Sequence, residues 1–425
     1  MTVTTIHNKD NPIIRGIKTV GIGKKGSKAL DATLVGEIME DLSQTQVPLL
    51  QQGAFFGALM IKGLTETERA LEKALPPGAL NDPKILCRYL AYDAPDHIRE
   101  ICARLVENET LSLDSARELG RFLLSETPGD GARGLAASIM RVRYETDEEY
   151  QGLLEAIQET LEPPFRQDIP QGQPVIQLAE PFDGVDHSNL ITPLIAQYLQ
   201  TLDYRVVSLA GRNSGPKSGN NLFDLVQAMT VEFMTNSQQL ANPNPPFGWY
   251  VNQQDMSKSL DRWVELRRAI IKRPFLATLE RFVNPCRASI FIASAFHPPY
   301  GEKMLEVCER AGYPAAIVVR NGLEGTIAFP LKRNVKILCS VRQENKKYLR
   351  NEIDFSPEQF LNTTVPIEEK LDHPILEKNK ELILRHDQEG RSGYELFDLR
   401  VKATRAGLTQ AVRWIETFSN FKTMV

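Results

Sequence analysis

Short apolar runs that alternate with helical patterns fill the middle of this 425-residue chain, from about residue 175 to residue 340. The runs are Val175–Leu178, Arg205–Leu209, Ala288–Ile292, Ala315–Val319 and Val335–Leu338. Strands that alternate with helices form a sheet whose faces the helices cover. The alternation therefore predicts an α/β fold with a mixed sheet flanked by helices. A long amphipathic pattern at Gly393–Phe418 predicts a final helix that packs back on this layer.

The first 160 residues carry helical patterns only, and part of this region is repeated. Leu34–Leu75 and Ser115–Ala156 superpose at an offset of 81 residues. The superposed pairs include Gly53 on Gly134, Lys62 on Arg143 and Glu68 on Glu149. In the first copy, helices are expected from Asp31 to about Leu42, over Leu50–Lys62 and over Glu66–Leu75. We predict a separate all-α N-terminal domain with a duplicated helical unit. The alternative is that amphipathic helices resemble one another by composition.

Prolines divide the helical part of the chain from the alternating part. Pro163-Pro164 and Pro170–Pro174 mark a linker, because proline interrupts both helices and strands. We therefore expect three domains: a helical extension with the first copy (residues 1–95), a helical domain with the second copy (96–165) and an α/β domain (166–425).

The composition is that of an ordinary globular protein, with 42% hydrophobic and 24% charged residues. A net charge of −4 provides no global attraction to nucleic acid or to anionic membranes. No apolar run reaches the roughly 18–20 residues of a membrane span, and the polar first ten residues are unlike a signal peptide. The five cysteines are dispersed, and the six histidines show no paired metal-ligand spacing. We expect a cytoplasmic protein with reduced core thiols, no membrane segment and no transition-metal centre.

Two polar clusters follow two of the strand-like runs and open helical patterns over residues 190–202 and 222–233. The first cluster consists of Asp183, Gly184, Asn189 and Thr192. The second is the run Arg212-Asn213-Ser214-Gly215-Pro216-Lys217-Ser218-Gly219, in which Arg212, Lys217, Ser218 and Gly219 are the candidate site residues. Glycines at a strand-to-helix turn let backbone N–H groups approach an anion, and the two cations add positive charge. The clusters predict a site for a phosphorylated ligand. The alternative is a solvated loop that carries two cations.

A glycine-rich segment near the N-terminus also matches a nucleotide-binding pattern. Gly21–Gly26 reads GxGxxG and follows a strand-like Lys18–Val20. A dinucleotide site requires a second strand and an acidic residue about 20 residues further on. Helical patterns follow instead, so we interpret the segment as a basic lead-in to a helix.

Two further segments could bind ligands. Lys258–Arg273 carries six basic and two acidic residues with Trp263 among them, which is typical either of a nucleic-acid or phosphate surface or of an ordinary surface helix. Glu324 follows the fourth strand-like run and is either a helix cap or a Mg²⁺ ligand.

In their order along about residues 100–420, these motifs resemble the anthranilate phosphoribosyltransferase family, which is glycosyltransferase family 3 and shares the fold of the pyrimidine nucleoside phosphorylases. The family's pyrophosphate motif GTGGDG…NxxT falls on Ala179–Thr192 and keeps the whole first cluster, but Ala179-Glu180-Pro181-Phe182 replaces its opening residues. The motif HGNRxxSSKSG falls on Leu209–Gly219 and keeps Arg212 and Lys217-Ser218-Gly219, but its histidine and its first serine positions are lost.

The resemblance extends to the acceptor and metal motifs, with losses. The acceptor-site arginine corresponds to Arg273, whereas the paired histidines that face anthranilate fall on Met256-Ser257. Of the metal pair in DGLDE, only Glu324 remains. Leu111–Ile157 resembles the family's helical domain. The first copy resembles the N-terminus of a divergent, anthranilate phosphoribosyltransferase-like paralogue branch for which nucleic-acid binding has been proposed.

The resemblance implies transfer of a phosphoribosyl group from 5-phosphoribosyl pyrophosphate to an amine acceptor. Both clusters would bind the donor, Arg273 the acceptor and Glu324 a Mg²⁺ ion, and the protein would be a homodimer. Pro181 lacks an N–H that a pyrophosphate loop would use, and Glu180 adds negative charge beside the loop. The acceptor is therefore unassigned and need not be anthranilate. The alternative function is a non-catalytic nucleic-acid-binding paralogue of the same fold.

Overall fold

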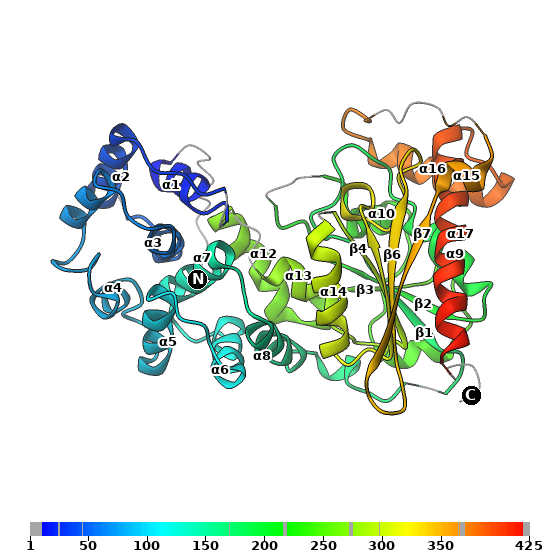
Figure 1. Cartoon of the computed structure of the whole chain (residues 1–425), viewed down its shortest axis with the longest axis horizontal. Helices are drawn as coiled ribbons and strands as arrows, with labels where there is room; N and C mark the ends of the chain where they lie inside the picture. Colours follow the sequence, from blue (N-terminus) through cyan, green and yellow to red (C-terminus); the bar gives the residue numbers. More distant parts are fainter. Residues whose placement is uncertain are drawn as a thin grey trace. The chain divides into compact units, whose positions relative to one another are not determined.

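The computed structural model describes residues 11–23, 26–44, 46–169, 171–215, 219–271, 275–296, 298–363, 365 and 370–419. The chain divides into two compact units, whose elements are labelled in Figure 1. The helical unit consists of Met1–Glu159 and Arg262–Glu280, and the sheet unit consists of Thr160–Asp261 and Arg281–Val425. Residues 262–280 lie inside the range expected for the α/β domain, but they pack with the helical unit.

The sheet unit contains a seven-stranded mixed sheet in the order β3-β2-β1-β4-β5-β6-β7. The strands are β1 Val175–Ala179, β2 Arg205–Ala210, β3 Trp249–Asn252, β4 Ile290–Ala295, β5 Ala315–Arg320, β6 Val335–Arg342 and β7 Tyr348–Phe355. Strands β1 to β5 are parallel to one another, whereas β6 is antiparallel to both of its neighbours, β5 and β7. All five expected strands are present, and the predicted mixed α/β fold is confirmed. Strands β3 and β7 were not predicted.

Helices cover both faces of this sheet. The helical elements of the unit are η2 Pro163–Phe165, α9 Thr192–Gln200, α10 Leu222–Ala228, η3 Ser237–Ala241, α11 Gln253–Met256, α14 Pro298–Arg310, η5 Leu323–Gly325, α15 Pro357–Leu361, α16 Leu376–Glu389 and α17 Glu395–Thr417. Gly301 of α14 lies against Leu338 and Gly407 of α17 against Ile337. Neighbouring strand residues point to opposite faces, so α14 and α17 lie on opposite sides of the sheet, as Figure 1 shows. The expected packing of the last helix is confirmed.

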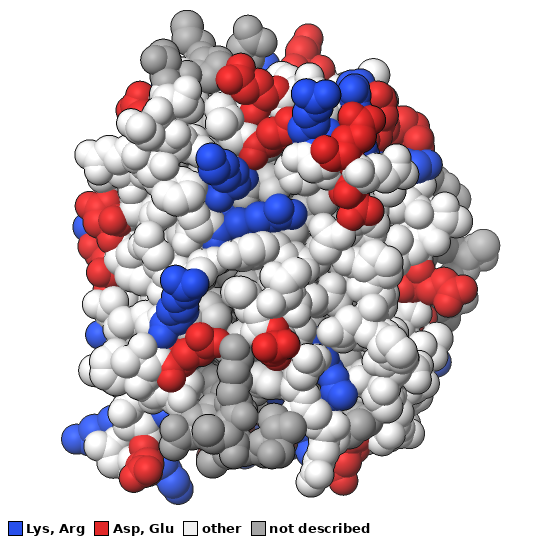
Figure 2. All heavy atoms as spheres, turned by 90° about the vertical axis from the view of Figure 1, so that its right-hand side faces the viewer, with Lys and Arg blue, Asp and Glu red and all other residues white. Residues whose placement is uncertain are grey.

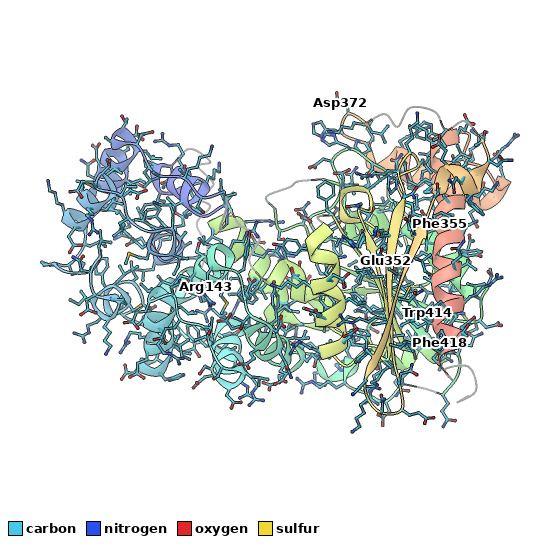
Figure 3. The ribbon with its side chains drawn as sticks, viewed as in Figure 1. Arg143, Glu352, Phe355, Asp372, Trp414 and Phe418 are labelled. Carbon is cyan, nitrogen blue, oxygen red and sulfur yellow. The ribbon has the colours of Figure 1, made fainter. Side chains whose placement is uncertain are left out.

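The core of the sheet unit lies between the sheet and the α17 side. It includes alternate residues of the central strands, such as Ile176 and Leu178 of β1, together with side chains of α9, α16 and α17. All five residues of β1 are buried, as expected for a central parallel strand covered on both faces. The edge strand β7 is mostly exposed, although its last residue, Phe355 (labelled in Figure 3), reaches the core.

The helical unit contains the predicted duplication. Its elements are α1 Pro12–Val20, α2 Ala32–Gln44, α3 Leu49–Lys62, η1 Glu68–Ala74, α4 Pro83–Leu90, α5 Asp96–Val106, α6 Leu113–Leu124, α7 Asp130–Arg143, α8 Asp147–Gln158, α12 Lys258–Ile270 (from Arg262) and α13 Leu276–Leu279. The 3-10 helix η4, Glu280–Phe282, follows α13. The bounds of α3 and α7 differ by 81 residues at both ends, the offset found in the sequence. Asp31 caps α2 by accepting a hydrogen bond from the Leu34 N–H at 2.8 Å, as expected.

Two sequence-based expectations for this unit are wrong. Lys18–Val20 belongs to helix α1 and not to a strand, because Asn11 caps the helix and its apolar residues face the core at helical spacing. Gly21–Gly26 therefore follows a helix, and its Lys24 and Lys25 lie outside the described residues. The segment after Thr67 is the 3-10 helix η1 and not an α-helix. Pro76-Pro77 directly beyond it would prevent an α-helix from continuing.

Candidate functional site

The carboxyl ends of β1, β2, β4 and β5 lie at one edge of the sheet, because these strands are mutually parallel. From β1 the chain continues to β2 on one side, and it later returns to place β4 on the other side. Open α/β sheets bind their ligands beyond the strand ends at such a reversal of strand order. The described residues of both predicted clusters lie at this edge, in the loops that follow β1 and β2.

The loops after β1 and β2 meet in an isolated antiparallel β-bridge, a contact that we call the crossing. Val185 and Asn220 exchange two backbone hydrogen bonds, of 2.9 and 3.1 Å. Gly184 has a φ of 71°, and a Cβ on it would lie 2.4 Å from the Asn220 carbonyl oxygen. A Cβ on Gly219 would lie 2.3 Å from the Val185 carbonyl oxygen. Both predicted glycines are therefore necessary for the crossing, which places the described residues of the two loops in backbone contact.

Two asparagines stabilise the crossing: Asn213 of the second cluster, and Asn221, which was not singled out in the sequence. The Asn221 side chain donates to the carbonyl oxygens of Phe182 (2.7 Å) and Gly211 (2.9 Å), and it also caps α10. The Asn213 amide donates to the Gly219 carbonyl oxygen at 3.0 Å. Asparagine between a strand and a helix is a recognisable cap signal, but its bonds to a distant loop have no sequence signal.

Arg212 lies at the site but is bound to a carboxylate. Its guanidinium donates to both Asp261 carboxylate oxygens, at 3.0 and 2.8 Å, in a bidentate pair. The Asp261 side chain is 9% exposed and that of Arg212 is 32% exposed. The pair orients Arg212 and balances its charge, so much of the positive charge available to a ligand must come from elsewhere.

A buried carboxylate lies at the end of β1. Glu180 is 1% exposed and accepts a hydrogen bond of 2.6 Å from the Thr192 hydroxyl. It also accepts from the Ile327 N–H, at 3.2 and 3.4 Å to its two oxygens. Burial raises the pKa of Glu180 from 4.5 to about 7, although the Thr192 hydrogen bond and the charge of Arg281 counteract the rise. The hydroxyl predicted to bind a phosphate is thus bound to a side chain of the protein itself.

Arg281 lies at the reversal point between β1 and β4 and was missed in the sequence. Its guanidinium donates to the Ala179 carbonyl oxygen from Nε at 3.0 Å and from Nη2 at 2.5 Å. Nη2 also lies 3.3 Å from the Ser294 carbonyl oxygen. Ala179 is the last residue of β1 and Ser294 is the last but one of β4, so one buried cation joins both strand ends beside Glu180. The residues around Arg281 carry no motif that would have indicated this role.

The remaining residues of the first cluster are buried. Asp183 is 8% exposed and Asn189 is 4% exposed. The position of Asn189 is set by its neighbour Leu190, whose backbone N–H and carbonyl both bond to the side chain of Asn379 in α16, at 2.8 and 2.9 Å.

Glu324 holds the loop after β1 from the side of β5. Its carboxylate accepts hydrogen bonds from the N–H groups of Asp186 (2.8 Å) and His187 (2.9 Å) and from the Ser188 hydroxyl (2.8 Å). Both carboxylate oxygens therefore face hydrogen-bond donors. Within the described ranges, no three His, Cys, Asp or Glu side chains are grouped to hold a metal ion. In this arrangement the described residues do not fit a protein-bound Mg²⁺ ion.

Three predicted site residues, Lys217, Ser218 and Arg273, lie outside the described residues. The positions that replace the paired histidines are both buried: Met256 and Ser257 are 0% exposed. The Ser257 hydroxyl lies 2.6 Å from that of Thr160, so it is engaged within the sheet unit.

The basic segment that begins at Lys258 is largely used inside the protein. Trp263 is 1% exposed and donates to the Leu123 carbonyl oxygen at 2.9 Å. Arg267 is 2% exposed and forms a buried ion pair with Glu280 at 2.8 Å. Arg262 donates to the Ser125 carbonyl oxygen. On the face of the sheet unit in Figure 2, basic and acidic side chains are interspersed. These arrangements are typical of a packed helix and an ordinary surface.

All five cysteines are buried, as expected of core thiols. None of the helices in the described ranges has the length and apolar character needed to cross a membrane.

The chain matches no protein-family model. It is 26% identical over 226 residues to an uncharacterised protein of Aquifex aeolicus (strain VF5), and the match covers 53% of this chain and 67% of that protein.

Solved structures of anthranilate phosphoribosyltransferases share the fold. The enzyme from Saccharomyces cerevisiae in complex with PRPP and Mg is similar with a TM-score of 0.57 and 12% identity, over 78% of this chain and 92% of that one. The same enzyme in complex with 4-fluoroanthranilate is similar with a TM-score of 0.54 and 13% identity, over 77% and 90%. The enzyme from Thermus thermophilus is similar with a TM-score of 0.50 and 16% identity, over 77% and 99%. At these identities the likeness establishes the fold alone.

Proposed function

We propose that the protein binds a 5-phosphoribosyl pyrophosphate-type donor at the carboxyl ends of β1 and β2 and transfers the phosphoribosyl group to an amine. The observation that carries this proposal is the crossing of the two strand-end loops at Gly184 and Gly219. Two backbones in such close contact fix the positions of their N–H groups. Backbone N–H groups in fixed positions are expected where a protein binds an anionic ligand. The likeness in fold to an enzyme whose structure contains PRPP and Mg supports the same assignment.

The proposed reaction breaks the bond between the anomeric carbon and the pyrophosphate oxygen and forms a bond from that carbon to the amine nitrogen, which loses a proton. The protein's part is to position the donor and to stabilise the negative charge on the leaving group. Arg212 is balanced by Asp261, and Arg281 lies beside Glu180. We therefore assign the main cationic contact to Lys217, with Ser218 and the loop backbone beside it.

The acceptor that we propose is an amine other than anthranilate. The two positions that match the family's anthranilate-facing histidines are Met256 and Ser257, and both are buried in the sheet unit. They are therefore not available to contact a ligand in this arrangement. Arg273 remains the proposed acceptor contact, and the protein would be a divergent paralogue of the enzymes whose fold it shares.

Substitution of Lys217 tests the proposal. Lys217→Ala should weaken donor binding by roughly 10- to 100-fold, because a charged hydrogen bond contributes about 1.5–3 kcal/mol. Arg212→Ala is a poorer test, since it would leave Asp261 without its partner. The matched control is Lys347→Ala, in the exposed turn between β6 and β7 at the opposite edge of the sheet. Equal donor affinity of the Lys217→Ala and Lys347→Ala variants would contradict the assignment.

A further inference from the structure

The two copies of the helical unit share specific buried contacts as well as a pattern. Each copy contains a fully buried glutamate that forms an ion pair with a basic side chain. The glutamate also accepts two backbone hydrogen bonds, one from the residue three positions before it and one from a leucine 38 positions before it. The residues are Glu68, Thr65, Leu30 and Lys62 in the first copy, and Glu149, Thr146, Leu111 and Arg143 in the second. Arg143 is labelled in Figure 3. The leucine bond is 2.9 Å in both copies. General amphipathicity does not produce such a match, so the duplication is a property of the tertiary structure.

The copies contact each other reciprocally through α3 and α7. A Cβ on Gly53 would lie 2.1 Å from the carbonyl oxygen of Gly131, and a Cβ on Gly134 would lie 2.1 Å from that of Leu50. At the offset of 81 residues, Gly134 is the counterpart of Gly53 and Gly131 is the counterpart of Leu50. The contact from first copy to second is therefore repeated from second to first. Reciprocal contacts of this kind define a two-fold axis, as in a symmetric dimer interface.

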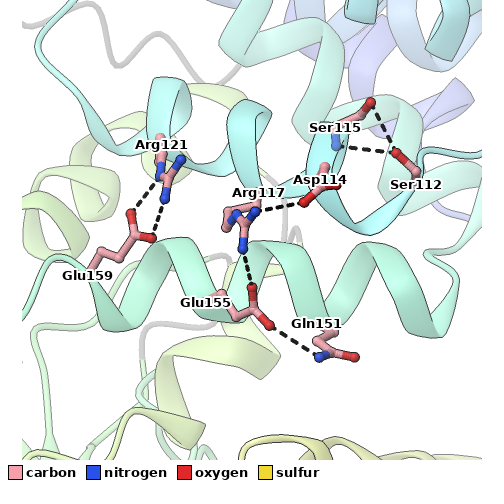
Figure 4. Close-up of polar contacts among 8 residues, drawn as sticks. All are labelled: Ser112, Asp114, Ser115, Arg117, Arg121, Gln151, Glu155 and Glu159. Carbon is pink, nitrogen blue, oxygen red and sulfur yellow. Dashed lines mark hydrogen bonds and ion pairs between the residues drawn. The ribbon is translucent and has the colours of Figure 1, made fainter.

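This pseudo-two-fold contact is the centre of the helical unit. Residues of α3 and α7 are buried along most of both helices. The glycines let the two backbones approach closely, and a side chain at either position would force the helices apart. Away from the axis, the two copies differ. Figure 4 shows ion pairs of Arg117 and Arg121 on α6 with Glu155 and Glu159 at the end of α8. Their counterparts in the first copy are Gly36, Glu40, Ala74 and Gly78, which cannot form these pairs.

We propose that the first copy is a built-in partner subunit. A chain with only one helical unit would pair with a second chain through the face formed by this glycine-bearing helix. In this protein the first copy covers that face of the second copy. The two-fold contact is thus satisfied within one chain, and the protein is a monomer. This differs from the homodimer that the resemblance implies. It does not depend on the donor-binding proposal, because all the residues involved belong to the helical unit.

Light scattering of the full-length protein tests the proposal directly. The particle mass should equal that of one chain, 47.8 kDa, over protein concentrations from the micromolar range to about a hundredfold higher. Twice that mass at any of these concentrations would overturn the proposal.

Matched glycine variants test whether the reciprocal contact exists in solution. Gly53→Ala and Gly134→Ala should each lower the apparent Tm by roughly 5–10 °C and by similar amounts, because both add a Cβ at the same point of a symmetric contact. The control is Gly36→Ala in α2, where a Cβ would meet nothing within 4 Å and where alanine should leave the Tm unchanged or raise it. If only one of Gly53→Ala and Gly134→Ala lowers the Tm, the pseudo-symmetric contact is overturned. If neither variant folds, the mass of the unaltered chain still decides the proposal.

Discussion

Glu180 is the residue whose environment departs most from that of a typical acidic side chain. It lies at the end of the central strand, and Thr192 and the Ile327 N–H donate to it while Arg281 lies beside it. Because burial raises its pKa to about 7, the folded protein binds a proton that the unfolded chain releases near pH 4.5. The resulting stabilisation is fully present below pH 4.5 and is lost as the pH rises through about 7.

Glu180→Gln should remove this pH dependence. Between pH 4.5 and pH 8 the unaltered protein should lose up to about 3 kcal/mol of unfolding free energy that the variant does not lose. The value follows because each pKa unit corresponds to about 1.4 kcal/mol. Urea denaturation at both pH values measures this difference. Glu344→Gln, in the exposed turn after β6, is the control. A difference that is the same at both pH values would show that folding does not raise the pKa of Glu180.

At the residue scale, the sequence indicated which side chains lie at the strand ends but not what they bind. Thr192, Arg212 and Glu324 are near the site, as expected from strands whose carboxyl ends share an edge. Their partners are Glu180, Asp261 and the loop 186–188, which lie 12 to 138 residues away in the chain. Such pairings follow from tertiary packing. Nothing around Arg281 in the sequence indicated its bonds to two strand ends.

At the scale of elements, the crossing of the loops after β1 and β2 depends on Gly184. Gly184→Ala should lower the free energy of unfolding by about 2–4 kcal/mol, because it combines an unfavourable positive φ with a clash against the Asn220 carbonyl. Gly215→Ala is a matched control in the same pair of loops. Gly215 has a similar φ of 69°, but a Cβ there meets nothing within 4 Å. This control should cost only about 1–2 kcal/mol.

Urea denaturation of the two variants isolates the contribution of the contact. Equal losses of stability would mean that the loops do not cross closely in solution, and the proposed site geometry would then lack its main support.

The elements that the sequence predicted best have strong periodic patterns. The five apolar strands are buried on the sheet and were all found, as was the long amphipathic helix α17. β3 has only four residues after a proline-rich loop, and β7 is an exposed edge strand, so neither shows a clear apolar run. Lys18–Val20 looked like a strand because of its short apolar end. It is helical because Asn11 caps the helix and the apolar residues from Ile13 to Val20 follow the helical period.

At the scale of the whole molecule, the sequence established the order of the helical and α/β parts and the internal repeat. It did not show that residues 262–280 pack with the helical unit, because the helices α12 and α13, which carry most of them, resemble other helices of the chain. Nor could a repeat in sequence distinguish a translational array from a two-fold pair. The reciprocal contacts of Gly53 and Gly134 make that distinction.

Calorimetric titration measures whether one chain binds a phosphoribosyl pyrophosphate-type donor at the crossed loops. The purified full-length protein is titrated with 5-phosphoribosyl pyrophosphate, with and without Mg²⁺. The proposal predicts saturable heat with one site per chain, and competition by inorganic pyrophosphate. An absence of heat at millimolar donor in both conditions, from protein whose circular dichroism shows it to be folded, would contradict donor binding at this site.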